Sequence, residues 1–141
     1  MVDAIKPVFT ALATATGGRN GHTEAADGTV KADLSVPKEM GGPGKPGTTT
    51  PEHLFAAGYA ACFHSALKVV AGGTDMSGSQ VSSDVAIGRL ASGGFGLAVA
   101  ITVTIPGLDR DAAEALVAKA HEVCPYSNAI RGNVDVDLRV A

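Results

Sequence analysis

The sequence predicts an α+β domain in which two helices pack against antiparallel sheets. Residues 54–67 contain no Asp, Glu, Lys or Arg and hold five Ala, the residue with the highest helix propensity. Residues 109–123 begin with an Asp suited to cap a second helix. Residues 30–36, 95–105 and 134–140 alternate apolar and polar side chains, as half-buried strands do. With 141 residues the chain is long enough to bury one core, and we expect the element order βββαββαβ.

The N-terminal part predicts three strands and a loop. Residues 8–16 are rich in Thr, Val, Phe and Leu and predict the first strand, and residues 22–26 predict the second. Asp27 and Gly28, which lead into the third strand, form a strong hairpin signal. Residues 37–50 are rich in Gly and Pro and predict a long loop that must either pack on other residues or move.

The first helix is expected to begin at Pro51. Thr50 suits the N-cap, and proline suits the first helical position because its missing N–H leaves no bond unmade. Gly72 and Gly73 end the helix. The charge-free run is shorter than the roughly 20 apolar residues that span a bilayer. We therefore expect a core helix buried on nearly all sides, and no membrane partner.

The C-terminal half predicts a hairpin, a helix and a last strand. Residues 81–90 predict a strand and residues 91–94 a turn, and one face of the strand at residues 95–105 is apolar. Asp109 caps the second helix, and Pro125 ends it because the residue before a proline avoids the α region.

The composition argues against several classes of protein. The net charge of −3, the lack of a Lys/Arg cluster and the absence of Trp argue against a nucleic-acid partner. Residues 1–7 lack a basic segment followed by an apolar one, so we expect a cytoplasmic protein. Thiols stay reduced in that compartment, where a disulfide would be transient and catalytic.

Two cysteines are the candidate reactive groups. Cys62 lies in the middle of the first predicted helix, and Cys124 lies at the end of the second. A buried cysteine is commonly inert packing, and this interpretation stays open. Two thiols, one on each helix of a chain with no other cysteine, indicate a pair that meets.

A reactive Cys62 would need a nearby cation. The thiolate is the nucleophile, an apolar site raises the thiol pKa, and Cys62 lies too far into its helix to benefit from the N-terminal dipole. Arg19 is the best candidate because the glycines around it allow the backbone to aim the guanidinium inward. Lys68 and the histidines are weaker candidates.

Glu52 is the expected carboxylate partner of a buried Arg19. Glu52 and Cys62 are ten residues apart, which is roughly 15 Å along one helix, so the two cannot touch within it. If they share a site, Glu52 comes from another subunit and the protein is a dimer. Alternatively, Glu52 is a first-turn carboxylate stabilised by the helix dipole.

Other chemistries have less support in the sequence. A zinc site could use His121 and Cys124, with Cys62 and His64, but no CxxC or HExxH motif occurs. A thiol hydrolase would need a His–Asp or His–Asn relay, and nothing near Cys62 in the sequence supplies one. The glycine-rich turn at residues 17–21 lacks the GK[ST] ending of a phosphate loop.

Several blocks resemble the organic hydroperoxide resistance (Ohr) branch of the OsmC-like superfamily. The blocks are Gly17-Gly18-Arg19, residues 50–63, residues 95–99, residues 123–129 and residues 131–133. They follow the family's order over nearly the whole chain. The chain departs from the family pattern at three positions, none of which carries a reacting group: Thr50 replaces the usual Asn, His53 the usual Gln, and Ile130 a common Thr.

The resemblance implies one OsmC/Ohr-like domain over residues 1–141 and an intertwined homodimer with two active sites at the subunit interface. It implies a thiol peroxidase that reduces alkyl and fatty-acid hydroperoxides to alcohols as part of an oxidative stress response. Cys62 would attack the peroxide and become a sulfenic acid, and Cys124 would resolve it as a disulfide. Arg19 would stabilise the thiolate and polarise the peroxide, with Glu52 holding Arg19.

The resemblance also implies recycling by dihydrolipoyl groups on partner proteins, with no cofactor, metal or haem. The apolar residues of the first helix suit a hydrophobic organic peroxide better than hydrogen peroxide. The loop at residues 37–50 is expected to act as a gate that carries Arg19 or Glu52 away once the thiolate is consumed. A non-catalytic OsmC-like lipid-binding protein and a metal-thiolate protein remain as alternatives.

Overall fold

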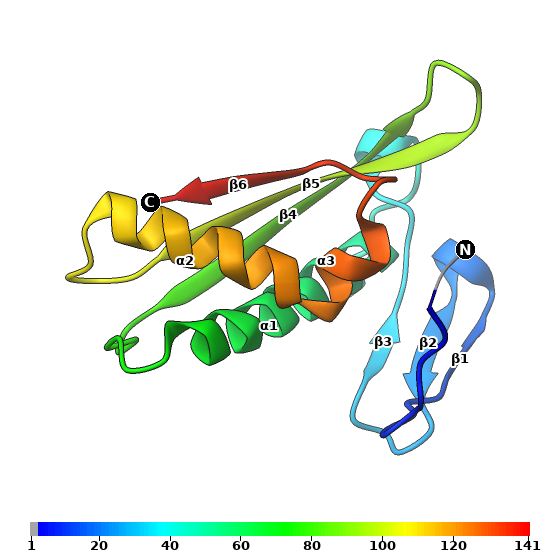
Figure 1. Cartoon of the computed structure of the whole chain (residues 1–141). Coiled ribbons are helices and arrows are strands. Elements are labelled where there is room, and N and C mark those ends of the chain that lie inside the picture. Colours follow the sequence, from blue (N-terminus) through cyan, green and yellow to red (C-terminus); the bar gives the residue numbers. More distant parts are fainter. Residues whose placement is uncertain (1–2) are drawn as a thin grey trace. The chain divides into compact units, whose positions relative to one another are not determined.

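Figure 1 shows the computed structural model of the chain, which describes residues 3–141. The described residues form two compact units that divide after Pro51. The predicted order is confirmed, with one additional short helix before the last strand. The elements are β1 (Ala13–Thr16), β2 (His22–Ala25), β3 (Lys31–Asp33), α1 (Pro51–Ala71), β4 (Gln80–Arg89), β5 (Phe95–Thr104), α2 (Arg110–Val123), α3 (Pro125–Ile130) and β6 (Val136–Val140).

The first unit is built on an antiparallel sheet in the order β1-β2-β3. Its strands are shorter than predicted, and residues 8–12 precede β1 instead of belonging to it. The predicted turn at Asp27 and Gly28 is confirmed: the Gly28 N–H donates to the Ala25 carbonyl, and Gly28 has φ of +77°. The Asp27 carboxylate accepts bonds from the backbone and the hydroxyl of Thr29, which closes the turn.

The first unit buries few side chains. Its buried residues are Leu34, Ser35 and Thr50, whereas every residue of β1 is exposed and Phe9 is 83% exposed. A sheet of three strands needs an apolar layer against one face to be stable in water. The large exposed apolar side chains near this sheet are Val8, Phe9 and Leu12, which precede β1.

Residues 37–50 form a loop with local order. It contains a 3₁₀ turn at Lys38–Met40, and a bridge between Leu34 and Thr49 ties its end to the strand that precedes it. The Ser35 hydroxyl bonds to the Thr48 hydroxyl and accepts from the Lys45 N–H. The expected gating role of this loop stays a prediction.

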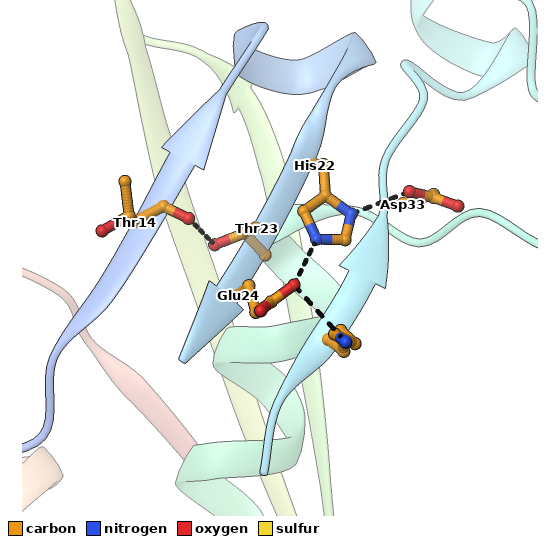
Figure 2. Close-up of polar contacts among 6 residues, drawn as sticks. Thr14, His22, Thr23, Glu24 and Asp33 are labelled. Carbon is orange, nitrogen blue, oxygen red and sulfur yellow. Dashed lines mark hydrogen bonds and ion pairs between the residues drawn. The ribbon is translucent and has the colours of Figure 1, made fainter. Parts of the chain in front are cut away.

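A polar cluster lies on the β2–β3 face (Figure 2). The His22 ring lies between two carboxylates, with Nδ1 2.8 Å from Asp33 Oδ1 and Nε2 3.0 Å from Glu24 Oε1. The hydrogen bond to Asp33, and then that to Glu24, raises the pKa of His22 above its usual range. The His22 ring therefore stays protonated to a higher pH than a free imidazole does, beside its cross-strand partner Asp33.

The second unit places α1 and α2 against the sheet β4-β5-β6. Side chains of both helices form one core with Val99, Ile101 and Val103, which share a face of β5. β4 and β5 pair antiparallel, as predicted, from Gln80 opposite Thr104 to Arg89 opposite Phe95. β6 instead runs parallel to β5, so this sheet is mixed and the expectation of wholly antiparallel sheets is wrong here. α2 connects the two parallel strands, a connection that parallel pairing requires.

α1 has the predicted bounds but is less covered than predicted. Its 21 residues and its apolar composition would suffice to span a membrane, but Tyr59, Phe63 and Leu67 are fully buried in the core of the second unit. α1 is thus the core helix of the second unit. The expectation of burial on nearly all sides is wrong for the single chain, because one face is exposed. The exposed residues are His53, Leu54, Ala57, Ala61, Ser65, Lys68 and Val69.

α2 ends where predicted, but the chain then starts α3 at once. The Asp109 carboxylate accepts from the Ala112 N–H, which confirms the predicted N-cap. Cys124 is extended (φ −65°, ψ 122°) because Pro125 follows it, and Pro125 then occupies the first turn of α3. Proline was interpreted only as a helix end, although it also favours a helix start.

α1 and α3 approach closely at Gly58. A Cβ at this position would lie 3.3 Å from Cε2 of Tyr126, closer than ordinary van der Waals contact. The Tyr126 ring also packs on the Tyr59 ring, with centroids 6.0 Å apart. A side chain at residue 58 therefore controls how near α3 lies to α1.

We expect the imidazole of His22 to titrate above its unfolded pKa of 6.5. The stability that this raised pKa contributes is fully present below the unfolded pKa and is lost as pH rises through the folded value. Asp33→Asn should lower the midpoint, measured by NMR of the ring protons, more than Glu24→Gln does. Equal midpoints in the wild-type and Asp33→Asn proteins would contradict this assignment.

We expect Gly58→Val to lower the free energy of unfolding by about 1–3 kcal/mol relative to Gly58→Ala. The alanine methyl meets only the edge of Tyr126, and its gain of up to about 1 kcal/mol in helix propensity offsets that contact. The two further methyl groups of valine would push α3 away. Urea denaturation measures the difference, and a gap below about 0.7 kcal/mol, explained by valine's helix propensity alone, would refute the close packing.

Candidate redox site

The two cysteines meet in the core of the second unit. Their Sγ atoms lie 3.7 Å apart and both are free thiols, which confirms the expectation that the pair meets. A disulfide has an S–S distance of about 2.05 Å, so a small movement would suffice to form the bond. α1 supplies Cys62, and the junction of α2 and α3 supplies Cys124.

The two thiols differ in exposure. Cys124 is 0% exposed, whereas Cys62 is only partly buried. A molecule arriving from solvent therefore meets Cys62 first. This difference agrees with the roles expected from the sequence, in which Cys62 attacks and Cys124 resolves.

The surroundings of Cys62 disfavour its ionised form. Burial raises the pKa of the Cys62 thiol, the backbone N–H of Tyr126 lowers it, and the neighbouring Cys124 raises it further, for a net rise. A thiol with a raised pKa is a poor nucleophile at neutral pH. Fast chemistry at Cys62 therefore requires an additional positive charge.

Aromatic side chains surround the thiol pair on one side. Tyr59 packs edge-on against Phe55, with centroids 6.1 Å apart, and tilts against Phe63 at 6.4 Å. Phe63 is fully buried, and Phe55 and Cys62 pack against the same core. The two sulfurs thus share an apolar core with aromatic rings, as the sequence predicted.

Sequence reasoning missed the hydroxyl groups beside the sulfurs. The Tyr59 hydroxyl lies 2.6 Å from Ser127 Oγ, and His121 Nδ1 lies 2.8 Å from the same Ser127 oxygen. Tyr59 precedes Cys62 by three residues, and Ser127 follows Cys124 by three, so each lies about one helical turn from a cysteine. This spacing of three residues from each cysteine is the feature of the sequence that could have identified the two hydroxyl groups.

Arg19 and Glu52 lie in different units. Arg19 lies in the 3₁₀ turn Gly18–Asn20. A Cβ at Gly21 would lie 1.7 Å from the Thr16 carbonyl oxygen, so only glycine fits this tight turn. The predicted association of Arg19 with Cys62 and Glu52 stays a prediction.

Glu52 lies in the first turn of α1, ten residues before Cys62. With His53, Ala56 and residues 83–86 of β4, it lines an open pocket of about 300 Å³. Glu52 therefore lies at the N-terminal end of α1, where the helix dipole stabilises an acidic side chain.

The histidines of the zinc alternative have other partners. His64 Nε2 lies 2.9 Å from the Ser79 hydroxyl, and His121 bonds to Ser127. Within residues 3–141, no three His, Cys, Asp or Glu side chains are grouped so that they could hold a metal ion.

Comparison with known proteins places the chain in a family. Residues 42–139 match the model of the OsmC-like protein family. The organic hydroperoxide resistance protein of Xanthomonas axonopodis is 49% identical, with full coverage of both chains. The crystal structure of an organic hydroperoxide resistance protein from Legionella pneumophila superposes with a TM-score of 0.90 at 54% identity, covering 96% of this chain and 99% of the other.

A second crystal structure gives the same result. The OhrB protein of Bacillus subtilis superposes with a TM-score of 0.86 at 45% identity, covering 96% of this chain and all of the other. The α+β class and the OsmC-like fold are therefore confirmed. With its two thiols in contact and its full-length similarity to these relatives, the chain belongs to the OsmC-like family and, within it, to the organic hydroperoxide resistance branch.

Proposed function

We propose that this protein is a cysteine-based peroxidase that reduces organic hydroperoxides to alcohols. One observation carries the proposal: a partly buried thiol and a fully buried thiol lie 3.7 Å apart in a member of the organic hydroperoxide resistance branch. Such a pair can give two electrons to a substrate as it becomes a disulfide, and can regain them when a reductant restores the thiols.

The reaction has two steps in this chain. The Cys62 thiolate attacks one peroxide oxygen, the O–O bond breaks, an S–O bond forms, and the leaving alkoxide takes a proton to become the alcohol. Sulfur is oxidised to a sulfenic acid while the peroxide is reduced. The Cys124 thiol then attacks this sulfur, expels water and leaves a Cys62–Cys124 disulfide.

The substrate class follows from the apolar surroundings of Cys62. Phe55, which like Cys62 is only partly buried against the apolar core, offers hydrocarbon contact to an alkyl chain. Hydrogen peroxide cannot use such contact, whereas each buried methylene of an alkyl or fatty-acid peroxide contributes about 0.8 kcal/mol. We therefore propose organic hydroperoxides as the substrates.

Arg19 is proposed to supply the missing positive charge, and Glu52 to hold Arg19. The proposal is supported by the raised pKa of Cys62 and by the glycine-built turn that carries Arg19. A guanidinium at the sulfur would favour the thiolate and would also polarise the bound peroxide.

We propose a homodimer with an intertwined arrangement of subunits. The first unit exposes the apolar side chains of residues 8, 9 and 12, and α1 exposes Leu54, Ala57 and Ala61 along one face. Small side chains allow the helix of a second copy to approach closely. Because Glu52 and Cys62 lie ten residues apart on α1, a shared site would then combine residues of both subunits.

The disulfide must be reduced before the next turnover. A dihydrolipoyl group on a partner protein is a dithiol that can do this by thiol–disulfide exchange, ending as a cyclic disulfide. We therefore propose a dihydrolipoyl-bearing protein as the reductant and the cytoplasm as the location.

We expect one equivalent of an alkyl hydroperoxide to remove two hydrogen atoms from the reduced protein, as measured by intact mass. Cys124→Ser should instead gain one oxygen atom, because no thiol resolves the sulfenic acid. Cys62→Ser should not change in mass. A wild-type protein that keeps its mass would refute the peroxidase.

We expect Arg19→Gln to raise the pKa of Cys62 by about 1–3 units, the range that one nearby charge gives. The second-order rate with hydroperoxide at neutral pH should fall by about 10- to 1,000-fold, because the thiolate fraction falls by the same factor. Alkylation rates against pH in a Cys124→Ser background measure the pKa. Arg89→Gln, in the β4–β5 hairpin, serves as control. An unchanged Cys62 pKa in Arg19→Gln would contradict the proposed role of Arg19.

A further inference from the structure

A pair of hydroxyl groups links α1 to α3 beside the pair of thiols. The Tyr59 hydroxyl and Ser127 Oγ lie 2.6 Å apart, and both residues are fully buried. Tyr59 and Cys62 are three residues apart on α1, and Ser127 and Cys124 are three apart at the start of α3. The two links therefore lie side by side between the same two segments.

The hydroxyl link also reaches α2. His121, in the last turn of α2, places Nδ1 2.8 Å from Ser127 Oγ. Arg131 donates from Nη2 to the His121 carbonyl at 2.6 Å and from Nη1 to Asn128 Oδ1 at 2.5 Å. Hydrogen bonds thus hold both sides of the break at which Cys124 lies.

The hydrogen bonds of this network are mutually consistent when His121 is neutral. Burial, and then the Arg131 charge, lower the pKa of His121, while Glu122 raises it, for a net fall. A neutral imidazole can accept the Ser127 O–H at Nδ1, and the Ser127 oxygen can then accept the Tyr59 O–H. Buried hydroxyls that are fully paired in this way specify one geometry, which apolar contacts alone do not.

We propose that Tyr59, Ser127 and His121 act as a positioning clamp that keeps Cys124 aligned with Cys62 while the disulfide forms. The inference rests on the proposed function. The S–S distance must fall from 3.7 Å to about 2.05 Å after Cys62 has become a sulfenic acid. The Tyr59–Ser127 bond, one helical turn from the cysteines, would keep α3 beside α1, so that the remaining movement brings the two sulfurs together.

The clamp matters because the sulfenic acid has two fates. Attack by the Cys124 thiol gives the disulfide and water. Attack on a second hydroperoxide instead transfers another oxygen to Cys62, giving a sulfinic acid and a second alcohol, and this product is not recovered by thiols. A loosened Cys124 therefore shifts the products from disulfide toward sulfinic acid.

The test measures the reaction at Cys62 and the closure of the disulfide by Cys124 separately, in Tyr59→Phe and Ser127→Ala. In one experiment the oxidant is an alkyl hydroperoxide. The other uses dithiobis-nitrobenzoate, which reacts at Cys62 to release one coloured thiolate and then releases a second as Cys124 closes the disulfide. The first phase depends on reagent concentration and the second does not, so the intramolecular step is measured with or without peroxide chemistry.

We expect the second phase to slow about three- to tenfold in Tyr59→Phe, the range for loss of one neutral hydrogen bond, with the first phase within twofold of wild type. Ser127→Ala should slow the second phase at least as much, because it also loses the bond to His121. Under excess hydroperoxide the sulfinic acid fraction should rise by a similar factor. The double variant should be no slower than Ser127→Ala, because both substitutions break the same bond. Ser92→Ala, in the β4–β5 turn, provides a serine control.

A second phase at the wild-type rate in both variants would overturn the clamp, as would equal slowing of both phases, which indicates general loosening of the core. A wild-type protein that reacts with the aromatic disulfide but not with hydroperoxide would refute the proposed function. The clamp would still be measured by its second phase in that case.

Discussion

The contact between the sulfurs of Cys62 and Cys124 depends on the break between α2 and α3. Pro125 prevents Cys124 from continuing α2 and then starts α3, so the thiol lies at a corner that faces α1. Gly58 leaves room for Tyr126 beside it, and the Tyr59–Ser127 bond links the same two segments. The break sends the chain after Cys124 into α3, which carries Tyr126 and Ser127 to α1.

The core that brings the thiols together also opposes their chemistry. Cys62 packs against an apolar core, which suits the proposed organic substrate, yet the same burial raises the thiol pKa. A neutral thiol attacks peroxides slowly. The proposed function therefore requires a positive charge from outside this core, with Arg19 as its proposed source and Glu52 proposed to hold Arg19. A single chain that exposes apolar residues on α1 and around β1 agrees with the proposal that a second copy completes the site.

Elements with a strong local signal were predicted well. α1 followed from its composition and its Pro and Gly boundaries, and β5 followed from strict alternation. The prediction of β1 was too long, because β propensity over residues 8–12 does not supply a pairing partner. α3 was missed because Pro125 was interpreted only as a terminator, and the parallel pairing of β6 leaves no mark in its alternation pattern.

The sequence by itself determined the element order, the caps and the two cysteines as the reactive candidates, because propensity, alternation and residue chemistry are local properties. Only the tertiary structure decided that the sulfurs lie 3.7 Å apart, that Cys124 is the more buried, and that Tyr59, Ser127 and His121 are linked. Distances between residues 62 positions apart depend on how helices pack, and packing sums many weak contacts that no single segment encodes.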